Sequence, residues 1–237
     1  MCDFTIIIPV YNEEENLFPL TKLLVEFMEK CDLKTSVLFI NDGSTDGSQQ
    51  KIESICRQNN GFKFIELQEN KGLSAALKVG FDYVESPWTG YMDSDLQVNP
   101  DDFLRLLPHR HHYALVNGIR TNRNDSIVKK ISSIVANRFR RIFTRDGIAD
   151  TTCPLKVIKT SFAKKIPMFD GMHRFIPALI QLENGKVHQV PIRHYPRIYG
   201  KPKFGVKNRL FGGIIACFIF LWIRRNYITY AIKSKAV

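Results

Sequence analysis

The first half of the chain alternates between short apolar runs and amphipathic polar stretches. Apolar, β-branched runs occupy residues 4–10, with an interruption at Pro9, and residues 36–40 and 62–67. Each run leads through a polar turn into a segment with apolar residues at helical spacing; Asn12 is expected to cap the first helix, and the next two span about 49–58 and 73–84. Three strand, loop and helix units predict an α/β fold with parallel strands in a doubly wound sheet.

Polar loops follow the predicted strands. They contain Tyr11-Asn12, Asp42-Gly43-Ser44, Asn70-Lys71-Gly72 and, after a fourth apolar stretch, Asp93-Ser94-Asp95. In open α/β sheets ligands bind at the carboxyl ends of the strands, where all four loops are expected to meet. The pattern therefore predicts one binding site at this edge.

The segment from Tyr91 to Gln97 carries the most specific chemistry. In a continuing strand, the side chains of Asp93, Asp95 and Gln97 would share one face. Two carboxylates and an amide suit a hard divalent cation, Mg²⁺ or Mn²⁺, which can hold a diphosphate. An isolated D-x-D is more often a polar strand end before a turn, here at Asn99-Pro100, and the neighbouring loops favour the metal site.

These motifs resemble family 2 glycosyltransferases of the GT-A fold, a Rossmann-like α/β class. The similarity rests on I-P-V-Y-N-E-E-E, N-D-G-S-T-D-G-S, N-K-G-L-S-A-A and D-S-D-L-Q, in this order and spacing. It is strongest to the branch that uses polyprenyl phosphates, the dolichyl-phosphate mannose synthases and the undecaprenyl-phosphate enzymes of bacteria. Further counterparts are Gly118-Ile119-Arg120, Ser133 with Asn137, the Asp150-x-x-Cys153-x-x-Lys156 element, residues 173–179 and residues 194–201, so that the resemblance covers residues 4–209.

The resemblance implies a nucleoside-diphosphate sugar as donor, a polyprenyl (undecaprenyl or dolichyl) phosphate as acceptor, and Mg²⁺ or Mn²⁺ as cofactor. It implies donor contacts from Pro9, Tyr11, Glu13, Asp42, Asp93 and Ser94, and metal ligation by Asp93, Asp95 and Gln97. It implies acceptor-phosphate contacts from Arg120, Lys129, Ser133 and Arg197, with Asp95, Arg120 and Arg197 carrying catalysis. Asp150 and Arg174 are implied on the acceptor side. A phosphate acceptor is already anionic, so inverting in-line attack requires no strong base.

Two positions depart from the family pattern. Pro202 follows Gly200-Lys201 where relatives carry serine, and Pro154 replaces a glycine beside Cys153. Proline lacks an amide donor and has a restricted backbone, so either change can mark a different sugar or acceptor.

Charge separates the chain into two halves. Residues 1–118 hold 10 Lys and Arg against 18 Asp and Glu, whereas residues 119–237 hold 24 against 5, giving net charges of −8 and +19 and a total of +11. A half this basic is expected to face an anion such as a lipid phosphate or a membrane surface. Nucleic acid is disfavoured, because no zinc-finger, RRM or KH pattern is present and the D-x-D loop would have no role.

The C-terminal segment is expected to associate with a membrane without crossing it. Residues 210–223 form an uncharged run of 14 residues, about 21 Å as a helix against a hydrocarbon core of roughly 30 Å. Arg224 and Arg225 follow, and Trp222, Tyr227 and Tyr230 are aromatic rings that favour the interface. We expect an interfacial helix held partly by anionic lipids, with a core helix of the globular domain as the alternative.

The predicted organisation is a GT-A domain over residues 1–209, divided into a nucleotide half (1–118) and a basic acceptor half (119–209), and a membrane-interface helix with a basic tail over residues 210–237. No signal peptide is expected, because Met1 leads directly into the first predicted strand, and the five cysteines lack C-x-x-C spacing, which indicates reduced thiols. The expected location is the cytoplasmic face of the plasma membrane. Residues 109–112, rich in histidine, are expected to form a solvated loop.

Rival functions belong to other classes. A processive polysaccharide synthase should carry Q-x-x-R-W and several membrane spans, which this sequence lacks. A non-catalytic basic membrane-binding module would not need the intact D-S-D-L-Q segment. Transfer to a hydroxyl of a lipid-linked glycan would require a general base, for which the sequence offers no unambiguous candidate. The sugar, the nucleotide and oligomer formation stay open.

Overall fold

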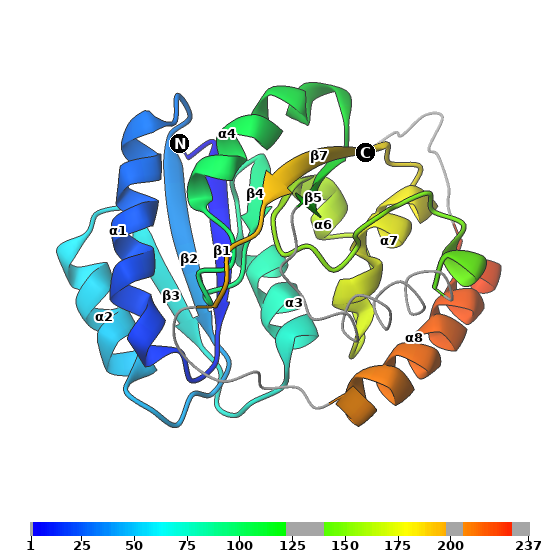
Figure 1. Cartoon of the computed structure of the whole chain (residues 1–237), viewed down its shortest axis with the longest axis horizontal. Coiled ribbons are helices and arrows are strands. Elements are labelled where there is room, and N and C mark those ends of the chain that lie inside the picture. The colour runs from blue at the N-terminus through cyan, green and yellow to red at the C-terminus, as the bar shows by residue number, and fades with distance from the viewer. Residues whose placement is uncertain (1, 122–139, 198–205, 229–237) are drawn as a thin grey trace, which may run out of the picture.

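The computed structural model describes residues 2–121, 140–197 and 206–228, with side chains of the last segment from Gly213 onward. Its centre is a seven-stranded sheet in the order β3-β2-β1-β4-β6-β5-β7 (Figure 1). The strands are β1 (Phe4–Val10), β2 (Thr35–Asn41), β3 (Phe62–Glu66), β4 (Trp88–Tyr91), β5 (Leu115–Thr121), β6 (Lys156–Lys159) and β7 (Val187–Arg193).

Strand direction gathers the functional loops. β1 pairs in parallel with β2 and β4, β2 with β3, and β5 with β7, whereas β6 runs antiparallel between β4 and β5. Every strand of this sheet except β6 therefore points the same way. The carboxyl ends of β1, β2, β4, β5 and β7 lie at one edge, together with the amino end of β6.

Helices cover both faces of the sheet, as Figure 1 shows. The core on one face includes side chains from α1 (Glu14–Lys30), α2 (Ser48–Gln58) and α4 (Phe103–Leu106). The core on the other includes α3 (Leu73–Tyr83), α6 (Thr160–Ala163), α7 (Ile176–Leu182) and α8 (Val206–Asn226). Ile6 and Ile8 of β1 enter the first core and Ile7 the second, as the alternation of a strand requires. The predicted doubly wound α/β sheet is confirmed.

Short 3₁₀ helices complete the described elements: η1 (Pro100–Asp102), η2 (Leu107–His112) and η3 (Met172–Phe175). η2 contains the histidine-rich stretch that was expected to be a loop. Its His109 ring lies 4.6 Å from the ring of His188 on β7, at the amino end of the strands and away from the predicted site.

The expected helix cap at Asn12 is wrong. α1 begins at Glu14 with Glu13 as its N-cap, and Asn12 has a positive φ of 50°. Its side-chain oxygen instead accepts a hydrogen bond of 2.7 Å from the Thr45 amide, so Asn12 ties the loop after β1 to the loop after β2. The strand also continues through Pro9 to Val10, in parallel register with β2.

Helix α8 has two apolar faces. Ala216, Cys217, Phe220 and Ile223 are buried, and the Phe220 ring stacks on Phe175 at 5.4 Å, so this face belongs to the core as the alternative reading expected. On the other face Ile215, Phe218 and Trp222 are 58%, 59% and 66% exposed. Among the described residues, no helix combines the length and apolar character that crossing a membrane requires.

A close approach of two loops shapes the donor edge. Gly43, at φ +65°, lies so near the next loop that an added Cβ would sit 2.5 Å from the carbonyl carbon of Glu69. Beside it, the Asp42 carboxylate accepts hydrogen bonds of 2.8 Å from the amides of Lys71 and Gly72 and one of 3.0 Å from the Asn70 side chain. The loops after β2 and β3 are therefore docked onto each other through Asp42.

Substituting Gly43 tests this docking. Gly43→Ala and Gly147→Ala both place alanine at a left-handed φ, +65° and +69°, but an added Cβ at Gly147 meets no atom within 4 Å. Each variant should lose about 1–2 kcal/mol for the backbone, and Gly43→Ala a further ~1–3 kcal/mol for the clash. Urea unfolding measures both. Equal losses would contradict the close approach.

Candidate active site

The predicted site residues follow consecutive strand ends at one edge of the sheet. Glu13 comes after β1, Asp42 after β2, Asp93 and Asp95 after β4, and Arg197 after β7, while Arg120 is the penultimate residue of β5. Because these strands run in parallel, residues from both halves of the chain meet there. The acidic loops of the first half thus face the arginines of the basic half.

The D-x-D segment is a loop and not a continuing strand. β4 ends at Tyr91, residues 94–98 form bends, and Leu96 has a φ of +60°, so the expected alternation of Asp93, Asp95 and Gln97 along a strand is wrong. The Tyr91 hydroxyl donates to Asp93 Oδ1 at 2.8 Å. The Gln97 amide donates to Asp95 Oδ1 at 3.1 Å. The two carboxylates are therefore positioned by a tight turn and not by the alternation of side chains along a strand.

The two aspartates interact electrostatically. Burial, followed by the nearby charge of Asp95, raises the pKa of Asp93 to about 6. Burial also raises the pKa of Asp95, although the charge of Arg197 opposes this shift. Two carboxylates that disfavour each other's ionised form provide a place where a cation is stabilised.

Arg197 lies between two acidic residues of different loops. Its Nη2 is 2.7 Å from Asp95 Oδ2, and its Nη1 is 3.6 Å from Glu13 Oε1. Asn16 donates to the other Glu13 oxygen, Oε2, at 2.5 Å. The loop that carries Arg197 is also fixed to the D-x-D loop, because the Tyr195 amide donates to the Gln97 carbonyl at 2.9 Å.

Arg120 and Asp150 form a buried bidentate pair. Nε and Nη2 of Arg120 donate to the two carboxylate oxygens at 2.7 and 2.8 Å, and Nη2 also donates to Thr152 Oγ1 at 2.8 Å. Burial alone would raise the pKa of Asp150, but the hydrogen bonds and charge of Arg120 outweigh it and lower this pKa to about 2. Asp150 therefore holds the arginine in one orientation.

Lys156 is a buried cation at the end of the Asp150-x-x-Cys153-x-x-Lys156 element, and the sequence alone assigned it no role. It begins β6, is 1% exposed, and donates through Nζ to the carbonyls of Thr151 and Cys153. Burial lowers its pKa to about 8, against the favourable charges of Asp150 and Asp93. Its position three residues after Cys153 was the sequence feature that could have pointed to a role for Lys156. Its burial, however, depends on the strand order, which puts β6 beside β4.

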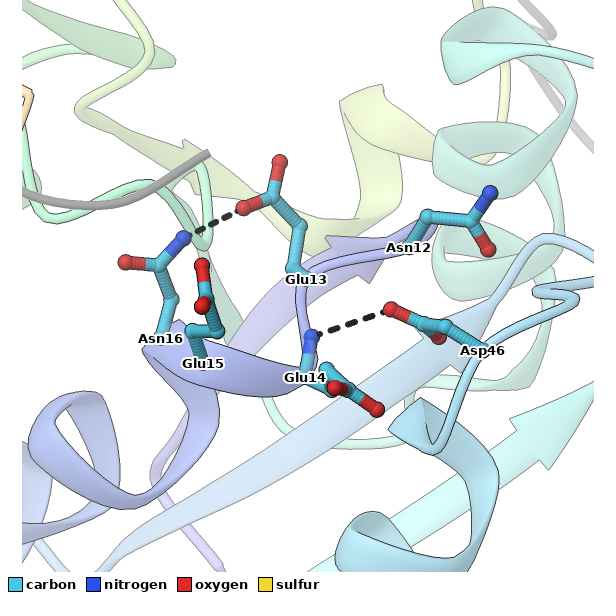
Figure 2. Close-up of a pocket in the computed structure, with 6 residues that line it drawn as sticks. All are labelled: Asn12, Glu13, Glu14, Glu15, Asn16 and Asp46. Carbon is cyan, nitrogen blue, oxygen red and sulfur yellow. Dashed lines mark hydrogen bonds between the residues drawn. The ribbon is translucent and has the colours of Figure 1, made fainter. Parts of the chain in front are cut away.

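A pocket of about 210 Å³ opens beside the first loop, lined by residues 12–16 and Asp46. Figure 2 shows Glu13 and Asn16 turned toward each other and Asp46 beside the start of α1. Asp46 accepts a hydrogen bond from the Glu14 amide at 3.3 Å, and the Glu14 carboxylate accepts one from the Gly47 amide at 2.7 Å. Glu14 and Asp46 thus serve the local loop structure, and Glu13 connects this pocket to Arg197.

The remaining predicted residues divide into three groups. Pro9 and Tyr11 lie partly buried at the end of β1, and Ser94 is buried between the two aspartates. Gln97 contributes main-chain hydrogen bonds to the loop, and within the described residues its side chain makes none. Lys129 and Ser133 lie outside the described residues, as do Lys201 and Pro202.

Asp93 and Asp95 fit a divalent cation that is completed by a ligand. Within the described ranges no cluster of three or more His, Cys, Asp or Glu is arranged to hold a metal on protein groups alone. Mg²⁺ is usually held by one or two carboxylates together with substrate phosphates, and the paired aspartates match this donor set. Asp95 already neutralises its charge with a cationic group, Arg197.

The Arg120–Asp150 pair should make stability depend on pH. The folded-state pKa of Asp150, about 2, lies below its ordinary value of 3.8, so the pair's stabilisation is present above pH ~4 and lost as pH falls through ~2. Asp150→Asn should therefore lower the free energy of unfolding by about 2 kcal/mol at pH 7, and the difference from wild type should narrow toward pH 3. Urea unfolding at several pH values measures this, with the exposed Asp82→Asn as control. A difference independent of pH would contradict it.

Comparisons with known proteins agree with this arrangement. Over 212 residues the chain is 28% identical to the dodecaprenyl-phosphate galacturonate synthase of Rhizobium johnstonii, covering 87% of this chain and 63% of that relative's length. The fold resembles that of glucosyl-3-phosphoglycerate synthase from Mycobacterium tuberculosis, solved with Mn²⁺, UDP and glucosyl-3-phosphoglycerate (TM-score 0.68, 14% identity, 94% of this chain and 80% of that one). It also resembles S. aureus TarS in complex with UDP-GlcNAc (TM-score 0.61, 17% identity, 92% and 66%).

These structural likenesses establish the GT-A-like fold, and the family follows from sequence. The family model described as "Glycosyl transferase family 2" matches residues 5–166, more than half of the chain, from β1 through β6 and α6. The matched range contains every loop at the site edge except the one that carries Arg197. The chain therefore belongs to glycosyl transferase family 2.

Proposed function

We propose that this protein transfers a sugar from a nucleoside-diphosphate sugar to a polyprenyl phosphate, with inversion at the anomeric carbon and with Mg²⁺ or Mn²⁺ bound at Asp93 and Asp95. The observation that carries the proposal is the meeting of this carboxylate pair with Arg120 and Arg197 at one sheet edge. The name of the Rhizobium johnstonii relative, which contains a polyprenyl phosphate, supports the acceptor class.

The donor side is built from the acidic half. The docked loops after β2 and β3 give a fixed surface for the nucleoside, with Asp42 as their organiser, and Glu13 and Tyr11 border it. Asp93 and Asp95 would hold the metal, which when bound supplies positive charge to the leaving nucleoside diphosphate. Gln97 is proposed as a further ligand, placed by its turn next to Asp95.

The acceptor side needs cations and no strong base. Asp150 and Thr152 occupy Nε and Nη2 of Arg120, while its Nη1 has no hydrogen-bond partner within the described residues. A guanidinium held on one side in this way can present its remaining donors to a phosphate oxygen in a fixed direction. Lys129, Ser133 and Arg197 are proposed to complete the phosphate contacts.

The outward face of α8 suits the membrane in which a polyprenyl acceptor lies. Ile215, Phe218 and Trp222 follow one another at intervals of three and four residues, and Ile142, on the helical turn 140–144 beside α8, is 66% exposed. The Phe143 ring on that turn lies 5.7 Å from the Phe218 ring, so the turn packs against α8 and the exposed apolar side chains of both segments are neighbours. Exposed Arg224 and Arg225 at the end of α8 complement anionic headgroups. We place this surface on the cytoplasmic leaflet.

A transfer assay tests the reaction. Purified protein is incubated with polyprenyl phosphate in detergent and a panel of radiolabelled UDP- and GDP-sugars, including UDP-galacturonate and UDP-glucose. One sugar should enter the lipid phase, the reaction should stop in EDTA and resume with Mn²⁺ or Mg²⁺, and Asp95→Ala should abolish it with the fold intact. Asp82→Asn, on the exposed side of α3, is the matched control. Full activity in EDTA, or transfer only to a hydroxyl acceptor, would refute the proposal.

Vesicle binding tests the membrane surface. Deleting α8 would also remove Phe220 from the core, so the outward double variant Phe218→Ser/Trp222→Ser is the cleaner probe. It should keep its melting temperature and bind phosphatidylglycerol vesicles at least tenfold more weakly, because each ring contributes ~1.5–3 kcal/mol when buried. Tyr83→Ser, which removes a ring that is 70% exposed on α3, should leave binding unchanged. Undiminished sedimentation of the double variant with vesicles would contradict this surface.

A further inference from the structure

The position of Arg197 is unusual for a residue proposed to bind the acceptor. Its guanidinium lies between Asp95 and Glu13, both at least nine-tenths buried, at 2.7 and 3.6 Å. Asp95 is a proposed metal ligand, so Arg197 contacts the donor side of the site. The structure thus places one cation of the basic half where a divalent cation would bind.

The guanidinium of Arg197 pairs with two negative charges, but only one of its two terminal nitrogens makes a hydrogen bond to a described residue. Nη2 makes a short charge-assisted hydrogen bond to Asp95, yet Nη1 is buried and has no hydrogen-bond partner in the described part of the chain. An unsatisfied buried donor is unfavourable, so this arrangement is less complete than that of Arg120, whose Nε and Nη2 both bind Asp150. Of the two arginines, Arg197 is therefore the one that can change partners at low cost.

The backbone next to Arg197 is anchored by a hydrogen bond that does not involve the Arg197 side chain. The Tyr195 amide is bonded to the Gln97 carbonyl, which keeps the loop after β7 on the D-x-D loop. The Arg197 side chain as a whole is 24% exposed, against 10% for that of Asp95, so it is the more accessible member of the pair although its Nη1 is buried. This backbone anchor does not involve the Arg197 side chain, so it can persist when the guanidinium changes partner.

We propose that Arg197 acts as a latch: it occupies the cation position at Asp95 until metal and donor diphosphate bind, and its displacement then frees it for the acceptor phosphate. Asp95 Oδ2 cannot contact the guanidinium at 2.7 Å and a metal ion in the same place, and the two cations repel each other. Donor binding thereby prepares the acceptor site, and substrates bind in the order donor, then acceptor. This inference rests on the proposed function for its second step.

The first step is tested by metal binding alone, without sugar nucleotide or lipid. Electron paramagnetic resonance of free Mn²⁺ gives its dissociation constant for wild type, Arg197→Gln and Arg57→Gln. Arg57 pairs with Glu53 on the exposed side of α2, and its substitution removes the same charge far from the site. Arg197→Gln should bind Mn²⁺ about tenfold tighter than wild type, as expected for loss of a competing charge-assisted hydrogen bond, and Arg57→Gln should match wild type.

Arg197→Lys is a second variant that guards against misfolding. It keeps a cation near Asp95 and Glu13 but loses the planar guanidinium group, so its affinity for Mn²⁺ should lie between those of wild type and Arg197→Gln. Melting temperatures establish that each variant is folded. Equal or weaker Mn²⁺ binding by both folded Arg197 variants would overturn the latch.

The second step is tested by acceptor binding to polyprenyl phosphate in detergent micelles. Wild type should bind it more tightly when Mn²⁺ and UDP are present, and Arg197→Gln should lose this enhancement. An enhancement that survives in Arg197→Gln would overturn the release to the acceptor. Tighter Mn²⁺ binding together with no polyprenyl-phosphate binding under any condition would uphold the competition at Asp95 while refuting the proposed function.

Discussion

Compensation of buried charge is the constraint on which this site depends. Asp95, Asp150 and Lys156 are each less than 9% exposed, and Arg120 is only slightly more accessible, at 12% of its side chain. Isolated charges at such positions would be strongly destabilising, so each must have a partner. Asp150 pairs with Arg120, Asp95 pairs with Arg197, and Lys156 binds two carbonyl oxygens. Of these contacts, the Asp95–Arg197 pair joins the acidic half of the chain to the basic half, and the other two lie within the basic half.

The two arginine pairs differ in a way that suits different tasks. Arg120 is held by both carboxylate oxygens and a hydroxyl, which fixes the orientation of its guanidinium, as the proposed phosphate contact would require. Arg197 pairs with two carboxylates from separate loops, and its buried Nη1 has no hydrogen-bond partner among residues 2–121, 140–197 and 206–228. Under the proposed function, a rigid cation and an exchangeable one at the same edge would allow the donor and acceptor phosphates to bind in sequence.

Helix α8 is apolar on both its buried face and its exposed face, which would let a single helix serve the proposed lipid acceptor. Its inner face completes the core beneath Phe175, and its outer face presents Ile215, Phe218 and Trp222. Because the inner face fixes the helix to the domain, contact of the outer face with a bilayer would also orient the active-site edge relative to the membrane. The buried face agrees with the prediction of a core helix, and the exposed apolar face is compatible with the prediction of an interfacial helix.

The sequence by itself determined the first four strands and the first three helices, the doubly wound class, and the polar loops that follow those strands, because periodicity of apolar residues and turn chemistry are local properties. It also predicted Asp93, Asp95, Arg120 and Arg197 as site residues, and the structure brings these four to one edge of the sheet. It did not determine that Asp93 and Asp95 lie in a turn, that Asn12 links two loops instead of capping α1, or that Lys156 is buried. Nor could it reveal that Arg197 binds Asp95, 102 residues away in the chain. Tertiary structure decided the burial of Lys156 and the Arg197–Asp95 contact, because both depend on where β6 and β7 lie in the sheet and on the need of buried charges for partners. It also decided the role of Asn12, which depends on the docking of the loop after β1 onto the loop after β2.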